Sequence, residues 1–163
     1  MPRRAALALT LAALLWTLVL VTAPAALSHP SLTLPATMVY AAASRICHQR
    51  PERSFHVAGA QVPVCGRCLG LYVSSAFGAL LAWASRRRPE GSVRVVLAVA
   101  AVPTAVTWGL EAVGAATFAN EVRAIAAVPL GLAAGWVTIQ LLRYDSLLNG
   151  HEIHDRGPRV HVR

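Results

Sequence analysis

The chain has 163 residues, of which 56% are hydrophobic and 13% charged, and its mean hydropathy is +0.53. Soluble domains average about 25% charged residues, so this composition indicates a membrane protein, and its length suits a single domain. The chain has 15 basic and 7 acidic residues. All the basic residues are arginines, and they lie between apolar runs. This arrangement is typical of membrane-protein loops and argues against a nucleic-acid partner. Without lysine, Schiff-base chemistry and a Walker phosphate-binding loop are excluded.

Four apolar stretches are long enough to cross a bilayer, since a spanning helix needs about 20 residues. We therefore predict an all-α, polytopic helix bundle forming a single membrane domain over residues 1–163, in contact with the lipid bilayer. The predicted helices cover residues 5–27, 63–84, 93–118 and 122–142. A loop over 28–62 joins the first two, and a polar tail follows from 143 to 163. Only "ANE" separates the last two helices, which predicts a tight antiparallel hairpin.

The first stretch has two interpretations. Its basic start "MPRR", its apolar run and the later Ala-Pro-Ala suit a signal peptide that is cleaved near residue 26. The apolar run is longer than the 7–15 residues usual in signal peptides, which favours a retained helix. Either interpretation leaves the loop over 28–62 on the same side of the membrane.

The distribution of arginine predicts the orientation, because cytoplasmic loops of membrane proteins are enriched in basic residues. This rule predicts an outer loop over 28–62, with the C-terminus and the N-terminus of a retained first helix in the cytoplasm. The arginines predicted to lie inside are Arg3, Arg4, Arg86, Arg87, Arg88, Arg94, Arg143, Arg156, Arg159 and Arg163. Those predicted to lie outside are Arg45, Arg50, Arg53 and Arg123.

All three cysteines of the chain lie within residues 46–72. With Pro63 as the first residue of the second helix, Cys65 and Cys68 share one face of its first turns. The unpaired N–H groups at a helix start stabilise a thiolate, and Arg67 adds positive potential there. A thiolate is the form that both metal binding and disulfide exchange require.

Cys47 and His48 complete a three-cysteine, one-histidine set, which is a common structural zinc site. Adjacent ligands require a sharp backbone turn, so His56 is the alternative to His48. Three protein ligands with one open position would instead make the site catalytic. Two simpler interpretations are a Cys65–Cys68 disulfide, and cysteines that pack as small hydrophobic residues.

A second functional hypothesis is a thiol-disulfide oxidoreductase. A Cys-x-x-Cys pair at the outer end of a helix in a four-helix bundle is similar to vitamin K epoxide reductase and to the quinone-linked disulfide-forming enzymes. That similarity implies quinone as the cofactor. Such enzymes relay electrons through a second cysteine pair, whereas this chain has only Cys47 beside Cys65 and Cys68.

The window also resembles the signature of the domain-of-unknown-function 2085 family of small prokaryotic integral membrane proteins. The pattern is Cys-His-Gln, Pro-x-Arg-Ser-Phe and Cys-x-Arg-Cys-x-Gly, and it falls on Cys47, His48, Gln49, Pro51, Arg53, Ser54, Phe55, Cys65, Arg67, Cys68 and Gly70. The resemblance covers roughly residues 40–140 and implies a shared Cys/His site in the cytoplasmic membrane, with no known activity. Asn120 and Arg123 match later family positions, but "TWGLE" replaces an Asp-Gly, with Glu111 standing in for the acid.

Glu111 lies deep in the third apolar stretch, where an ionisable side chain is costly unless it is paired. Arg123 is its predicted partner, and Asn120 is expected to join them. The simpler interpretation is a structural ion pair, and the functional one is a wall of the Cys/His site. Of the loop arginines, we expect Arg45 and Arg50 to be solvated, whereas Arg53 is a candidate anion ligand.

Two further patterns have mainly structural interpretations. Gly131 and Gly135 form a Gly-x-x-x-Gly pair, which predicts close helix packing within the bundle or, alternatively, a homo-oligomer contact. The tail histidines lack the spacing of the zinc-protease motif and suit a flexible polar tail; they are His151, His154 and His161.

Overall fold

The computed structural model describes residues 2–57, 59–85 and 92–155. Within them, five α-helices, one 3-10 helix and one two-stranded sheet follow each other along the chain. In order these are α1 (Pro2–Ala26), α2 (Thr33–Ala43), η1 (Pro51–Arg53), β1 (Ser54–Val57), β2 (Ala60–Cys65), α3 (Gly66–Ala84), α4 (Val93–Ala112) and α5 (Asn120–Asp155).

Four helices in the described part of the chain are long and apolar enough to cross a membrane. The candidate spans are Arg3–Ala26, Gly66–Ala84, Val93–Ala112 and Asn120–Arg143. The prediction of a helical bundle with about four membrane helices is therefore confirmed, and the sheet is a minor addition.

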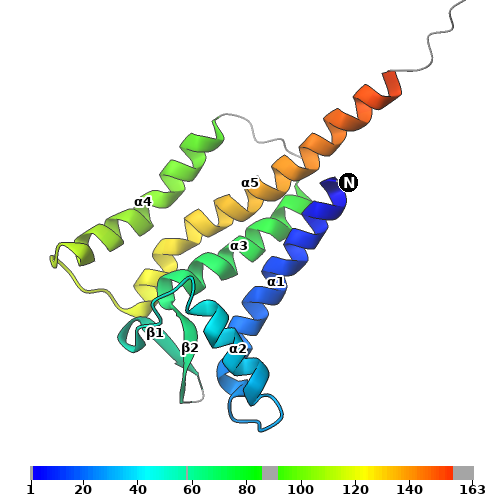
Figure 1. Cartoon of the computed structure of the whole chain (residues 1–163). Coiled ribbons are helices and arrows are strands. Elements are labelled where there is room, and N and C mark those ends of the chain that lie inside the picture. The colour runs from blue at the N-terminus through cyan, green and yellow to red at the C-terminus, as the bar shows by residue number, and fades with distance from the viewer. Residues whose placement is uncertain (1, 58, 86–91, 156–163) are drawn as a thin grey trace, which may run out of the picture.

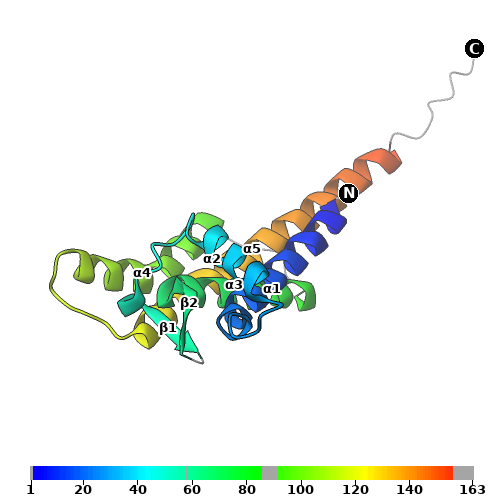
Figure 2. The same cartoon turned by 60° about the horizontal axis from the view of Figure 1, so that its bottom comes forward.

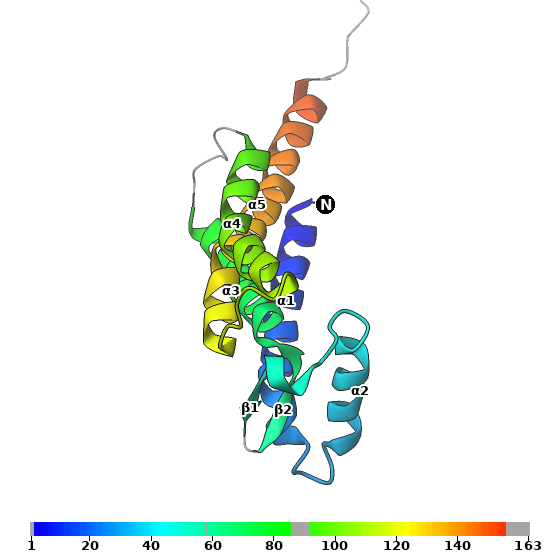
Figure 3. The same ribbon diagram turned by 90° about the vertical axis from the view of Figure 1, so that its left-hand side faces the viewer.

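The four long helices alternate in direction and lie side by side, with α4 on the far side of α3 and α5 from α1 (Figures 1 and 2). The start of α1 and the end of α5 lie at one end of the bundle. At the opposite end, α2 and the β1–β2 hairpin form a small head, as Figure 3 shows. An even number of crossings places the two ends of the helical region on one side and the head on the other.

The most extensive helix contact joins α3 and α5, and small residues bring the two backbones close together. A Cβ added to Gly70 would lie 2.3 Å from the Ala124 carbonyl oxygen, and one added to Gly78 would lie 2.2 Å from that of Leu132. From the other side, Gly135 meets the Ser75 carbonyl in the same way, at 2.0 Å. Gly131 and Gly135 therefore pack against α3 within the bundle, where small residues permit close van der Waals contact.

Helix α1 packs against α3 through aromatic and polar side chains. Trp16 and Tyr72 make an edge-to-face contact with ring centroids 6.3 Å apart, and the Trp83 indole donates to the Thr10 hydroxyl at 2.9 Å. Near the head, Leu20 of α1 joins a buried apolar cluster that also includes Val62 and Val64 of β2 and Cys47. The head is thus packed onto the bundle.

The segment predicted as a loop over residues 28–62 is more ordered than expected, because it contains α2 and most of the hairpin. The hairpin pairs Ser54 with Cys65 and Val57 with Ala60 in antiparallel register. Gly59, in its turn, has a φ of +78°, a conformation that glycine adopts without steric cost.

Two predicted helix boundaries differ from the structure. The second membrane helix begins at Gly66, because Pro63 and Cys65 are part of β2, in which Cys65 pairs with Ser54. The third ends at Ala112 rather than 118, since Gly114 adopts a φ of +73°, which is typical of the residue that closes a helix. The connection to α5 is therefore longer than the predicted tight hairpin.

The last helix also departs from the prediction of a flexible tail from residue 143. Helix α5 continues to Asp155, so His151 and His154 are helical, whereas His161 lies outside the described residues. Polar sequence ends a membrane span but does not by itself end a helix, because the backbone hydrogen bonds continue in water.

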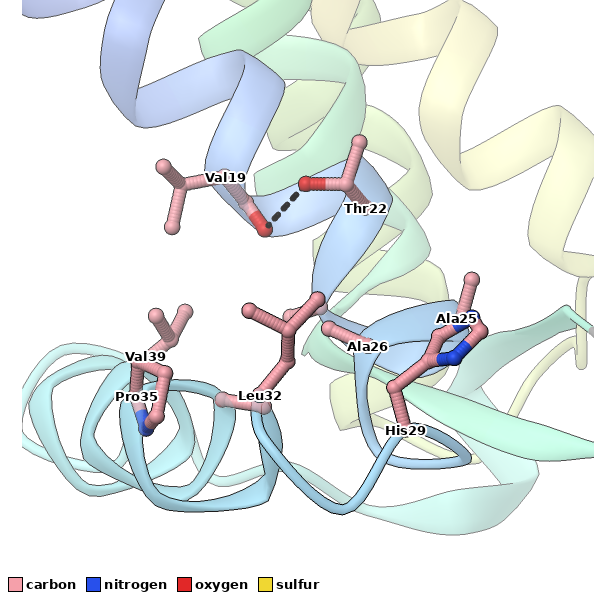
Figure 4. Close-up of a pocket in the computed structure, with 10 residues that line it drawn as sticks. Val19, Thr22, Ala25, Ala26, His29, Leu32, Pro35 and Val39 are labelled. Atoms are coloured by element: carbon pink, nitrogen blue, oxygen red, sulfur yellow. Dashed lines mark hydrogen bonds between the residues drawn. The ribbon is translucent and has the colours of Figure 1, made fainter.

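A cavity of about 400 Å³ lies between α1 and α2. Its lining is apolar apart from Thr22 and His29, and the Thr22 hydroxyl is bonded to carbonyls of its own helix. Figure 4 shows Val19, Leu32, Pro35 and Val39 around this space. The cysteines and the charged side chains of the candidate site line a different cavity.

Candidate metal centre and its cavity

Three sulfur atoms converge where the head meets the bundle. The Sγ atoms of Cys47, Cys65 and Cys68 all lie within 4.8 Å of one another, and all three cysteines are free thiols. Cys47 is 7% exposed and belongs to the apolar cluster of the head. The cluster therefore lies at the boundary between a packed core and an open cavity.

Cys47 is positioned by the end of α2 and by the residue pair that follows it. Its backbone N–H donates to the Ala43 carbonyl at 2.9 Å. Gln49 then turns the chain with a φ of +48°, an uncommon conformation for a residue with a side chain. The Gln49 side-chain amide donates to the Tyr40 and Pro63 carbonyls at 2.9 and 2.8 Å. This residue thus ties α2 to β2, directly beside Cys47.

Cys65 and Cys68 are presented by the transition from β2 to α3. Cys65 is the N-cap of α3 and has an extended backbone. It therefore precedes the first turn of the helix, whereas the sequence had placed it within that turn. Its N–H donates to Cys47 Sγ at 3.2 Å. This hydrogen bond links the loop cysteine to the helix pair.

The surroundings of Cys65 favour its thiolate. The hydrogen bond from the Cys68 side chain lowers the pKa of Cys65 to about 5, and bonds from the Cys68 backbone, Cys47 and the Arg67 backbone act in the same direction. Burial opposes them by raising the pKa. Free N–H groups at the start of a helix have this effect on cysteines in general.

The three thiols fit a soft divalent cation. Zinc–sulfur bonds of about 2.3 Å in a tetrahedron place the bound sulfurs roughly 3.8 Å apart, which the present spacing allows. Cysteine thiolates are among the preferred ligands of zinc. The N–H donated to Cys47 Sγ would also stabilise a thiolate at that position.

The two candidate histidines do not join the sulfur cluster. Among the described residues, the group that could hold a metal ion consists of the three cysteines alone. His48 is exposed and lines the adjoining cavity. His56 is exposed on β1, where it pairs with Gln61.

A cavity of about 490 Å³ opens beside the sulfurs and is walled by charged groups of α3, α4 and α5. Glu111 of α4 is the centre of this wall. Its Oε1 accepts from Arg123 Nε at 2.7 Å and from the Phe118 N–H at 3.4 Å. Its Oε2 accepts from Arg67 Nη2 at 3.1 Å. The predicted Glu111–Arg123 pair is therefore present, and Arg67 is a second partner.

These ion pairs are withdrawn from solvent. The Glu111 side chain is 4% exposed and that of Arg123 8%. Both residues line the cavity together with the three cysteines, so the pair is structural and also forms a wall of the site. Arg67 Nε is buried and has no hydrogen-bond partner among the described residues.

Three further residues position the elements that carry the site, namely Asn120, Ser54 and Gly70. Asn120 accepts from Arg123 Nη1 at 2.9 Å and donates to the Ser54 carbonyl at 3.1 Å, so it joins α5 to the hairpin. The Ser54 hydroxyl donates to the Arg50 carbonyl at 2.9 Å. The absence of a side chain at Gly70 allows α5 to approach. Each therefore has a positioning role.

Trp108 and Gln61 did not emerge from the sequence as residues in or near the site. Trp108 lines the cavity. Arg50 lines it too and is exposed, in agreement with the expectation that it is solvated. Gln61 donates to the Gln49 carbonyl at 2.6 Å and accepts from the Tyr40 hydroxyl through its own carbonyl. Trp108, three residues before Glu111, carried a usable signal, since i and i+3 share a helix face.

The fold and the site together define a polytopic helical membrane protein with a cysteine cluster at the end of the bundle that carries the head. The chain belongs to the family described as "Predicted membrane protein (DUF2085)", whose model matches residues 47–137. This match begins at Cys47 and includes all three cysteines, Glu111 and Arg123.

Two archaeal relatives support the assignment. An uncharacterized protein of Methanocaldococcus jannaschii is 31% identical over 103 residues, which are 62% of this chain and 64% of the relative. The chain thus covers slightly less than two thirds of that relative's length. An uncharacterized protein of Methanothermobacter thermautotrophicus is 27% identical over 93 residues, which are 57% of this chain and 84% of the relative. No solved structure matches the chain.

Proposed function

We propose that the protein is a single-domain integral membrane protein that binds zinc, or a similar soft divalent ion, through Cys47, Cys65 and Cys68. The observation that carries the proposal is the convergence of the three sulfur atoms within 4.8 Å. A bound ion would act as a Lewis acid, and its ligands would link Cys47 in the head to Cys65 and Cys68 at the start of α3. His48 lines the adjoining cavity and would be the fourth protein ligand in the alternative of a closed, structural site.

An open coordination position is the feature that would make this centre catalytic rather than purely structural. Structural zinc sites have four protein ligands, whereas catalytic sites have three and an open position for water or substrate. Three cysteines form the cluster, and a cavity adjoins it. We therefore favour a three-ligand site that faces the cavity.

We further propose that the head lies on the extracytoplasmic side of a prokaryotic cytoplasmic membrane and that α1 is retained. The arginine distribution in the sequence supports this orientation. The contacts of Trp16 with Tyr72 and of Thr10 with Trp83 support retention of α1, because they pack it against α3.

The test is the metal content of the purified full chain in detergent. We expect about one zinc per chain, and less than a tenth of that in Cys65→Ser and Cys68→Ser, because each loses a thiolate ligand. His56→Ala is the matched control and should retain the metal, whereas His48→Ala tests the fourth ligand. The proposal would be contradicted if wild-type protein, purified without chelators, contained no metal.

A membrane thiol-disulfide oxidoreductase is the second candidate, favoured by the lowered pKa of Cys65 beside two further thiols. A thiolate at Cys65 would attack a substrate disulfide. The Cys68 thiol would then displace the mixed disulfide, giving a Cys65–Cys68 disulfide and two substrate thiols. A quinol would return two electrons and two protons to the Cys65–Cys68 disulfide and become a quinone. In the opposite net reaction, substrate thiols would reduce that disulfide and a quinone would reoxidise Cys65 and Cys68. Metal-free protein whose disulfide is reduced by a quinol would support this candidate over zinc.

A further inference from the structure

We propose that the cavity beside the three cysteines binds the phosphate group of an anionic ligand, with Arg50 and Arg53 as its principal receptors. This inference rests on the proposed function insofar as the ligand would occupy the cavity that the metal centre faces. It names the class of molecule that the site receives.

The charge around the cavity is strongly unbalanced. Four guanidinium groups line it against the single carboxylate of Glu111; they belong to Arg50, Arg53, Arg67 and Arg123. Glu111 already pairs with Arg67 and Arg123. Three thiolates on a divalent ion leave only one negative charge, so a bound metal would not neutralise the remaining arginines.

Arg50 and Arg53 are the two arginines with no salt-bridge partner along the described wall of this cavity. Arg50 is the N-cap of the short 3-10 helix η1 and Arg53 is its last residue. The Arg53 N–H and the Ser54 hydroxyl both bond the Arg50 carbonyl, at 3.0 and 2.9 Å. The backbone between the two arginines is therefore fixed, which lowers the entropy lost when both hold one ligand.

Phosphate suits this arrangement better than a neutral ligand does. A guanidinium presents several N–H donors in a planar fork that matches phosphate oxygens, and phosphate has enough oxygens for two such forks. The buried Arg67 Nε–H shows that the opposite wall also has a donor without a partner in the described chain. The cavity volume of about 490 Å³ lies within the range of small-molecule sites, roughly 300–1,000 Å³.

The cavity also has an apolar side, formed partly by Trp108 of α4. The residues that line it lie at the head end of the membrane helices, the end that carries α2 and the hairpin in Figure 1. Lipid headgroups and dissolved anions are both available there. The phosphate could therefore belong to a lipid headgroup or to a free anion. The experiment separates these two sources.

The test is equilibrium binding of radiolabelled inorganic phosphate to the full chain in an uncharged detergent, at constant ionic strength. We expect saturable binding that weakens about tenfold or more in Arg53→Gln and in Arg50→Gln, because each loses charge-assisted hydrogen bonds. Arg45→Gln is the matched control, since Arg45 is exposed and is not among the residues that line the cavity. Arg53→Lys keeps the charge but loses the fork, so it should bind with intermediate affinity.

Competition identifies the source of the phosphate. Displacement of the label by short-chain phosphatidylglycerol, but not by phosphatidylcholine, would assign the site to anionic lipid headgroups. Failure of both lipids to compete would assign it to a free phosphate. Either result requires the saturable binding that the proposal predicts.

Two results would overturn the inference: no saturable binding by wild-type protein, or equal weakening in Arg45→Gln and Arg53→Gln. Metal content, measured on the same samples, keeps this test separate from that of the proposed function. Zinc without phosphate binding would contradict only the anion site. Phosphate binding without zinc would contradict only the metal centre. Circular dichroism of each variant checks that the helices are intact.

Discussion

Helices α3 and α4 both pack against α5, but they do so by different means. Between α3 and α5, glycines bring the backbones together along most of the interface. Helix α4 is largely exposed, apart from the Glu111 side chain. Its described polar contacts with α5 are those of Glu111 with Arg123 and of the Thr104 hydroxyl with the Ala126 carbonyl. One interface depends on shape and the other on a few polar groups.

The difference explains where the cavity lies. Close packing of α3 on α5 brings the two backbones into contact, whereas the contact of α4 leaves an open space at its end, between Trp108 and the cysteines. Cys68 therefore lies on α3, the helix that is closely packed against α5. Helix α4, with its sparser contact, forms another wall of the cavity.

Removing the Glu111 carboxylate should have the largest effect. Glu111→Ala leaves Arg67 and Arg123 facing each other without their shared anion, and breaking a buried ion pair costs about 3–5 kcal/mol. We expect a marked loss of stability, measured by unfolding of the purified protein in mixed micelles. Glu121→Ala removes an exposed acid from the start of α5 and should be close to wild type. Equal effects of the two variants would contradict a specific role for Glu111.

A methyl group at Gly70 should have the next largest effect. The added Cβ would lie 2.3 Å from the Ala124 carbonyl oxygen and would force α3 and α5 apart. Overpacking of this kind costs about 1–3 kcal/mol. Gly109→Ala is the control in the loosely packed helix, because a Cβ there meets nothing within 4 Å. If Gly109→Ala destabilised the protein as much, the contrast between the two interfaces would be wrong.

Loss of the Thr104 hydroxyl should have a smaller effect. Its hydrogen bond to the Ala126 carbonyl, at 2.8 Å, joins α4 to α5, and Thr104→Val should cost about 0.5–1.5 kcal/mol. Thr107→Val removes a hydroxyl that bonds only carbonyls of its own helix. Hydrogen exchange of the α4 amides should increase in the first variant but not in the second.

The last prediction concerns the reactivity of Cys65, which we expect to leave the packing of the helices unchanged. Because its pKa is lowered to about 5, chiefly by the Cys68 side chain, the thiolate persists as the pH falls and is lost only near that value. Alkylation of metal-free protein, followed by mass spectrometry of the labelled peptide, should decline near pH 5 rather than near the usual 8.5. Thr104→Val should not shift this profile, whereas Cys68→Ala should move it to higher pH.

Hydropathy and cysteine spacing were sufficient to predict four membrane helices and the proximity of Cys65 to Cys68. They did not predict α2, because its 11 residues are too few to span a membrane and resemble an apolar loop. Pro63 was assigned to a helix start because a proline is favoured there, but the strand β2 that contains it pairs with β1 in the hairpin, and this pairing overrides the local preference. The Arg67–Glu111 contact joins residues 44 positions apart, and no local pattern encodes it.

Helix α5 has a geometric consequence beyond its packing. Its 36 residues correspond to a length of about 54 Å, whereas the hydrocarbon core of a bilayer is about 30 Å thick. The helix carries Arg123 near one end and continues about a dozen residues, or ~18 Å, beyond the candidate span that ends at Arg143. The helix thus has a cavity wall near one end of its candidate span and protruding turns beyond the other end. Pro129 lies between them and donates no backbone hydrogen bond, so a change of tilt at one end reaches the other only through the turn around Pro129.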